Sequence, residues 1–293
     1  MQDMSGSIRL IAAMAVLVPA LSRGDPPRVL FYPSALRTAP NLLEGAKWMP
    51  PSEKSEKDSR AAKLQGGPFS ADEPAYEVES FAPESAYWRT HAKVSKGHKY
   101  LVGAWVKFAS AKVLFWCNGR RIDGKPSDQR LYCFSGFQAY LTHYFSEPIR
   151  RRLGGSPDEW RLMFRTLEYP EALVDDSMTI AMGLYMTTGK MAFAAPFLVD
   201  VTDAADTSLL IDIADAKPIR KLMIEHVGVR DAIWQKDFPK GVTDFMEAVP
   251  SVTDFRRGMD ARNQIDGHAL NVYYVDGSMT KVFAPLEHVC KHR

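Results

Sequence analysis

The feature that most constrains the fold of this chain is a series of short apolar runs separated by turn residues. The runs Tyr100–Phe108, Trp160–Leu167 and Met178–Thr187 alternate with a period of two, so that each has one clearly apolar set of side chains. Successive side chains of a strand point to opposite faces of a sheet, and runs of this kind bounded by turn residues are typical of strands. The pattern predicts an all-β sandwich with few helices.

Further strands are expected along the rest of the chain, at residues 112–117, 130–134, 190–199, 209–213, 220–227, 268–275 and 278–284. Asp276-Gly277 is the strongest hairpin signal, and Thr188-Gly189 predicts a second tight hairpin. Two helices are also expected. Residues 137–153 carry apolar side chains at helical spacing before a glycine pair and form a helical insert, and residues 242–249 form a short helix.

The 293 residues are about twice the ~150 expected for one domain. We divide them into a signal-like segment 1–22, a loop-rich amino-terminal segment 23–75, a sandwich 76–202 and a smaller β-rich carboxyl-terminal domain 203–293. The alternative is one elaborated sandwich, whose outer strands come from the last 85 or so residues.

The apolar run Leu10–Leu21 follows Arg9 and precedes small residues. It is too short to cross a membrane and suits the core of a secretory signal. It predicts an exported protein, secreted or periplasmic, with no stable membrane span. A buried amino-terminal segment and a wrongly assigned start codon are the alternatives.

The net charge and the cysteines bear on whether the chain binds nucleic acid, forms a disulfide or holds zinc. Lys and Arg number 37 against 35 Asp and Glu, and a formal charge of +2 gives no reason to expect nucleic acid. Cys117 and Cys133 lie 16 residues apart and would form a disulfide between neighbouring strands in an exported protein, or serve as small core residues. Cys290 has no partner in that scheme, and no cysteine has zinc-site spacing.

The second faces of the predicted strands combine aromatic rings, long hydrogen-bond donors and small residues. Few polar groups on a mainly apolar surface are typical of ligand sites, and a sugar offers both an apolar face and hydroxyl groups. The alternative is that these positions pack beneath the second domain or the amino-terminal segment. The predicted glycan-binding face consists of Trp105, Lys107, Arg161, Arg165 and Tyr185, with Trp88 or Trp116 as rim platforms.

Four motifs, in the correct order over roughly residues 40–202, resemble those of jelly-roll, galactose-binding-like carbohydrate-binding modules of the CBM4/9 type. They are Asn41-Leu42-Leu43 with Trp48, the segment 96–107 (KGHKYLVGAWVK), Glu159-Trp160-Arg161, and the closing segment 178–201. The resemblance implies a jelly-roll sandwich, a glycan or polysaccharide partner and often a structural calcium. Ala195-Pro196 replaces the acidic pair that usually precedes the last strand, so no cofactor or metal is expected here.

Motifs for catalysis are missing from the sequence: it contains no HExxH, GxSxG or phosphate-binding loop. The leading hypothesis is therefore an exported, non-catalytic bacterial protein that binds a glycan of the cell surface or the surroundings. One alternative is an enzyme acting on an acidic polysaccharide, a lyase using His143 with Tyr140 or Tyr144, or a hydrolase using Asp175-Asp176. The other is a structural protein of an envelope or phage-like assembly, with a protein partner bound through the carboxyl-terminal domain.

Overall fold

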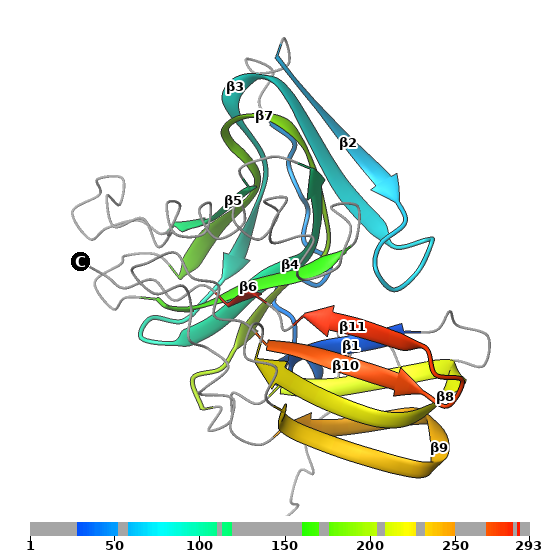
Figure 1. Ribbon diagram of the computed structural model, residues 1–293. Helices are drawn as coiled ribbons and strands as arrows, with labels where there is room; N and C mark the ends of the chain where they lie inside the picture. Colours follow the sequence, from blue (N-terminus) through cyan, green and yellow to red (C-terminus); the bar gives the residue numbers. More distant parts are fainter. Residues whose placement is uncertain are drawn as a thin grey trace, which may run out of the picture.

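The described strands lie in two sheets (Figure 1), in which all neighbours pair antiparallel except the short β12, which pairs parallel with β6. An apolar layer joins the two sheets. The computed structural model describes residues 28–51, 58–109, 113–118, 160–169, 176–203, 209–226, 232–249, 268–283 and 286–287. Within these ranges the larger sheet has the order β12-β6-β4-β7-β3-β2, with β5 also paired to β7. Its strands are β2 (Ser59–Gln65), β3 (Pro74–Lys93), β4 (Lys99–Ala109), β5 (Val113–Asn118), β6 (Arg161–Glu168), β7 (Ser177–Asp200) and β12 (Leu286–Glu287).

Two long strands fold the larger sheet over on itself. The first half of β3 pairs with residues 189–194 of β7, whereas residues 84–93 of β3 pair with residues 177–187 of β7, and the register shifts in between. β4 joins the carboxyl-terminal half of β7, and β5 joins its amino-terminal half. Figure 1 shows the resulting curve of β3 and β7. The sheet therefore forms both layers of a sandwich, as the alternating sequence predicted.

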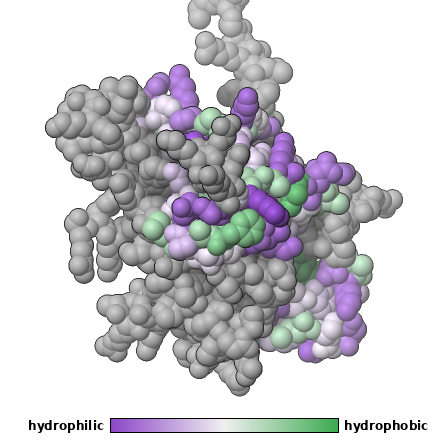
Figure 2. Space-filling view, turned by 90° about the horizontal axis from the view of Figure 1, so that it is seen from above, coloured by the Kyte–Doolittle hydropathy of each residue, from purple (hydrophilic) through white to green (hydrophobic). Residues whose placement is uncertain are grey.

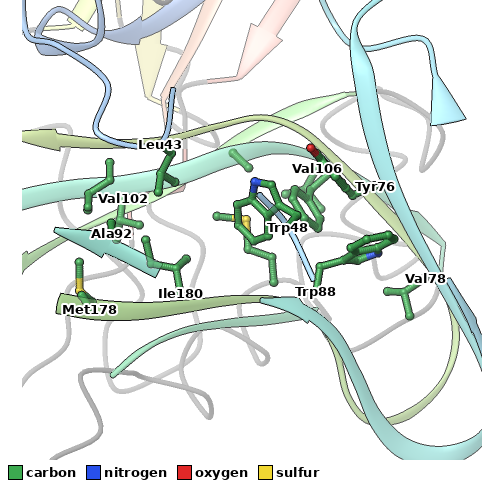
Figure 3. Packing of buried hydrophobic residues seen from close by; sticks show 14 of the residues in the cluster. Leu43, Trp48, Tyr76, Val78, Trp88, Ala92, Val102, Val106, Met178 and Ile180 are labelled. Atoms are coloured by element: carbon green, nitrogen blue, oxygen red, sulfur yellow. The ribbon is translucent and has the colours of Figure 1, made fainter. Parts of the chain in front are cut away.

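The core of the sandwich contains aromatic rings from both halves of the sheet (Figure 3). Trp48 packs edge-on against Phe193 with ring centroids 4.9 Å apart, and Tyr76 lies 5.2 Å from Trp88. The predicted apolar faces of two strands are confirmed over most of their length. Buried in this core are Tyr100, Val102, Ala104 and Val106 of β4, and Met178, Ile180, Met182 and Leu184 of β7. Met186, the last member predicted for β7, is exposed instead.

The smaller sheet has a core of its own. It consists of β1 (Arg28–Pro33), β8 (Leu209–His226), β9 (Ala232–Val249), β10 (His268–Tyr274) and β11 (Met279–Phe283). Long strands β8 and β9 pair with each other with register shifts near Pro218, and isoleucines and leucines of β8 fill the core. The predicted hairpin at Asp276-Gly277 is confirmed: it joins β10 to β11, and Gly277 supplies the positive φ of 85° that the turn needs.

A third apolar cluster joins the two sheets. It combines Leu101, Trp105, Leu162, Phe164, Phe197 and Val199 of the larger sheet with Tyr32, Ala35, Leu36 and Leu210, which come from β1, the short helix α1 (Ala35–Thr38) and β8. Within this layer the Tyr32 hydroxyl donates a hydrogen bond to the buried carboxylate of Asp212 at 3.0 Å. Burial first, and then the Asp212 charge, raise the pKa of Tyr32 far above its usual value.

Two local predictions are wrong. No hairpin forms at Thr188-Gly189, because the two runs continue as one strand along β3, and Gly189 adopts a φ of 131° where the strand bends. Residues 242–249 are not a helix, since they pair with residues 209–219 of β8 as part of β9. Within residues 23–75, expected to be loop-rich, the described part also contains β1, which joins one sheet, and β2, which joins the other.

Several predictions concern residues outside the described ranges, among them the signal-like segment, the strand at 130–134, the helical insert 137–153, Cys133 and Cys290. In the described part of the chain, no helix is long and apolar enough to cross a membrane.

Candidate functional site

Trp105 and Trp88, predicted as exposed platforms, are both buried. Trp105 is 4% exposed and packs edge-on against Phe69 and Phe197, with centroids 4.7 and 6.2 Å away. Trp88 is 6% exposed and donates its indole N–H to the Glu77 carbonyl oxygen at 2.9 Å. The predicted exposure is therefore wrong for both rings. For Trp105, the structure agrees with the alternative stated above. Its face of β4 packs beneath residues of β1, α1 and β8.

Lys107 lies next to this buried layer but does not meet the predicted arginines across the sheet. It is half-buried, and its Nζ lies 5.7 Å from the centre of the Trp160 ring. In the register of β6 on β4, Arg161 is opposite Val106 and Arg165 is opposite Val102, whereas Trp105 is opposite Leu162. The side chains of both arginines lie outside the described part. The backbone thus separates them from the positions of Trp105 and Lys107.

Tyr185 and Trp116 belong to the other half of the sandwich. Trp116 of β5 is paired with Ala181 of β7, and Tyr185 is four residues further along β7. Their side chains are likewise outside the described part, so only their register positions are known. Both positions lie in the part of the sheet formed by β3, β7 and β5.

On that face a row of polar and aromatic side chains follows β3. Alternation along residues 86–93 buries one set, Ala86, Trp88, Thr90 and Ala92, and leaves the other set half-buried or exposed. We call this second set the β3 outer row: Tyr87, Arg89, His91 and Lys93. Since residues directly opposite in an antiparallel sheet share a face, the row continues across β7 to β5, from Arg89 through Ala181 to Trp116 and from His91 through Thr179 to Asn118.

The members of the β3 outer row contact one another and β7. The Arg89 guanidinium carbon lies 6.0 Å from the centre of the Tyr87 ring, a cation–π distance. His91 Nδ1 and the Thr179 hydroxyl are 3.1 Å apart and share a hydrogen bond. Lys93 forms a long ion pair with Asp176 at 3.8 Å, with both side chains largely exposed. The row thus presents a ring, two cations and an imidazole in one line.

Small residues form the floor beside the row. Ala181 and Gly183 are both buried. A Cβ at Gly183 would lie 2.2 Å from the Ala86 carbonyl oxygen and 2.5 Å from Tyr87 Cα, so only glycine permits this approach of β7 to β3.

The sequence analysis did not identify the β3 outer row, although the alternation of its side chains could be recognised in the sequence. Residues Ala86–Lys93 (AYWRTHAK) alternate between small or buried and polar side chains. The single large apolar residue of the stretch, Trp88, faces the core and does not belong to the row. Reading the alternation, rather than the tryptophan, would have identified the row.

Other surfaces give no comparable site among the described residues. No group of three or more His, Cys, Asp or Glu side chains is arranged to hold a metal ion in the described part. On the face seen from above, hydrophilic residues surround a short hydrophobic band (Figure 2). Exposed large apolar residues include Phe81 and Met186, and single exposures of this kind are ordinary. His143, Tyr140, Tyr144 and Asp175, named for catalysis, lie outside the described ranges.

Solved structures similar to this chain include carbohydrate-binding modules. The CBM22-1 xylan-binding domain from Paenibacillus barcinonensis Xyn10C aligns with 61% of this chain and 98% of its own, at 8% identity and a TM-score of 0.38. TmCBM61 in complex with β-1,4-galactotriose aligns with 55% of this chain and 99% of its own, at 14% identity and a TM-score of 0.28. The structural neighbours thus include the kind of module that the sequence motifs resemble.

A viral enzyme domain is also among the similar structures. The enzymatically active domain of tailspike protein 4 from bacteriophage CBA120 aligns with 52% of this chain at 10% identity and a TM-score of 0.34, and the match spans only 19% of that domain. No protein-family model matches the sequence, and neither does any curated protein. Because the structural overlaps are partial, a function has to be argued from the residues of the chain itself.

Proposed function

We propose that the protein is an exported, non-catalytic glycan-binding protein and that the β3 outer row is the centre of its binding face. The observation that carries the proposal is the line of Tyr87, Arg89 and His91 beside the small floor of Ala181 and Gly183. A ring can stack on the apolar face of a sugar, while guanidinium and imidazole groups hydrogen-bond to its hydroxyl groups.

Two residues predicted from the sequence remain part of the proposed face. Trp116 occupies the position across Ala181 from Arg89, and Tyr185 lies on the same half of β7. Trp105 and Trp88 are not part of it, because both are buried in apolar layers. The affinity should be modest, since stacking on one aromatic ring contributes on the order of 1 kcal/mol. Dissociation constants in roughly the micromolar to millimolar range are expected.

The proposal is tested with a glycan array probed by the full chain and by two variants, Tyr87→Ala and Arg89→Ala. Phe81→Ala is a matched control, because Phe81 is an exposed ring of β3 that also has a cation above it, Arg60 at 5.2 Å, but lies outside the row. We expect selective binding that both row variants lose and the control retains. A folded protein that binds no glycan, or row variants that bind like wild type, would refute the proposed face.

A further inference from the structure

We propose that the free edge of β2 is a dimer interface, at which two copies of the chain pair their β2 strands antiparallel about a two-fold axis at Ala62. β2 pairs with β3 on one side and with no described strand on the other, and Figure 1 shows it at the outer edge of the larger sheet. Such an edge presents backbone N–H and C=O groups to which another strand can pair. The inference does not depend on the proposed function.

β2 is accessible and regular along its length. Residues 60–65 are exposed apart from Ala62, which is half-buried. The ladder with β3 runs from Ser59 to Gln65 without a register shift, and the strand contains no proline. Bulges and prolines are common means by which proteins keep an edge from pairing. β2 uses neither of them.

The longest described edge strand, β9, is protected in these ways. Among the described strands it pairs with β8 alone, it contains Pro239, and its register on β8 shifts three times. Lys236 and Glu247 form an ion pair and lie opposite Leu222 and Ile211 of the core, so that both charges are on the core side of this edge. Inward-pointing charges also hinder edge pairing. The contrast singles out β2 as the edge that can accept a partner strand.

The sequence of β2 is self-complementary in one register. With Ala62 opposite itself all seven residues of the strand pair, Arg60 lies opposite Leu64 of the second copy, and Lys63 lies opposite Ala61 of the second copy. Charges on an edge strand hinder unwanted pairing, and here they restrict the register. An axis at Arg60 or at Lys63 would place like charges directly opposite each other, which destabilises a sheet. An axis at Ala61 would pair fewer residues.

The same register covers exposed apolar side chains. Leu64 is 41% exposed, and Phe81 of β3 is 53% exposed with the Arg60 guanidinium carbon 5.2 Å from the centre of its ring. In the dimer, Leu64 of the second copy would pack against the aliphatic stem of Arg60 beside this ring. The two-fold axis repeats the contact at the other end of the strand pair. Because one pair of strands buries less area than a standard interface, the dimer should be weak.

Sedimentation velocity of the full chain, at concentrations from about 1 to 300 μM, measures the association. We expect a monomer at the low end that converts to a dimer as the concentration rises. Amide hydrogen exchange at both ends of the range needs no variant: amides of β2 should gain protection in the dimer, and those of β9 should not. A chain that stays monomeric, or a dimer whose β2 amides exchange as in the monomer, would overturn the inference.

Two substitutions of opposite charge at one exposed position then test the register. Leu64→Lys places a cation opposite Arg60 of the second copy and should weaken the dimer at least about fivefold, whereas Leu64→Glu places an anion there and should strengthen it about threefold. Ile233→Lys, at a 49% exposed position of the β9 edge, is the matched control and should leave the dimer unchanged. The inference fails if both Leu64 variants change the dissociation constant in the same direction, or if the control weakens the dimer as much as Leu64→Lys.

Discussion

Replacing Trp105 by alanine should destabilise the protein rather than remove a ligand contact. The indole is 4% exposed and packs edge-on against Phe69 and Phe197 in the layer that joins the two sheets. Truncation of a buried tryptophan typically lowers the free energy of unfolding by about 3–5 kcal/mol. Domains are commonly stable by only about 5–15 kcal/mol, so this loss is a large share of the total.

Equilibrium urea unfolding, followed by far-ultraviolet circular dichroism, measures the effect on the full chain. Trp105→Phe keeps a ring in the layer and should lose clearly less than Trp105→Ala. The exposed control Phe81→Ala should stay within about 0.5 kcal/mol of wild type. In a double-mutant cycle, Trp105→Ala and Phe69→Ala should couple by about 0.5–1.5 kcal/mol, as expected for an edge-to-face pair.

The reasoning would be refuted by one particular result. If Trp105→Ala unfolds at the wild-type urea concentration and loses glycan binding, the ring is an exposed platform, and the packing of the second sheet over β4 is incorrect. A destabilised variant that still binds glycans below its unfolding transition agrees with the burial of Trp105 and with a binding face elsewhere.

Two further predictions concern the close contact of β7 with β3 at Gly183 and the carboxylate of Asp200. Gly183→Ala should lower the free energy of unfolding by about 1–3 kcal/mol, because its Cβ would meet the Ala86 carbonyl oxygen at 2.2 Å; an unchanged thermal midpoint would contradict this. Burial alone would raise the pKa of Asp200, but hydrogen bonds from Thr202 and His98 lower it below the ordinary 3.8. Since the folded-state pKa is the lower one, this contribution to stability is present above about pH 4 and is lost as the pH falls through the folded pKa. Asp200→Asn should therefore lose less stability than wild type between about pH 4 and pH 2, and identical acid melting profiles would exclude the effect.

Local sequence determined the class of fold and most of the strands. Period-two alternation in Tyr100–Phe108 and Met178–Thr187 is enough to identify the core faces of β4 and β7, because side-chain direction in a strand follows from backbone geometry alone. Asp276-Gly277 similarly fixes a hairpin within a few residues, since the turn needs positive φ. These signals depend only on neighbours in the chain.

What alternation does not determine is what covers the second face of a strand. The opposite face of β4 looked like a ligand site, but β1, α1 and β8 pack over it, and they come from segments about 70 residues earlier and 100 residues later. Likewise, Thr188-Gly189 resembled a hairpin, and only the pairing of both flanking runs with β3 shows that β7 continues.

The residues of the candidate site are likewise brought together by strand pairing between distant segments. Arg89 and Ala181 are 92 positions apart in the sequence, and only the register of β3 on β7 brings them side by side. The sequence by itself determined which side chains alternate, and therefore that a polar face exists on these strands. The cover over the second face of β4, and the set of residues that share a face with Arg89, follow from the tertiary structure alone, because sheet packing joins segments that lie far apart in the chain.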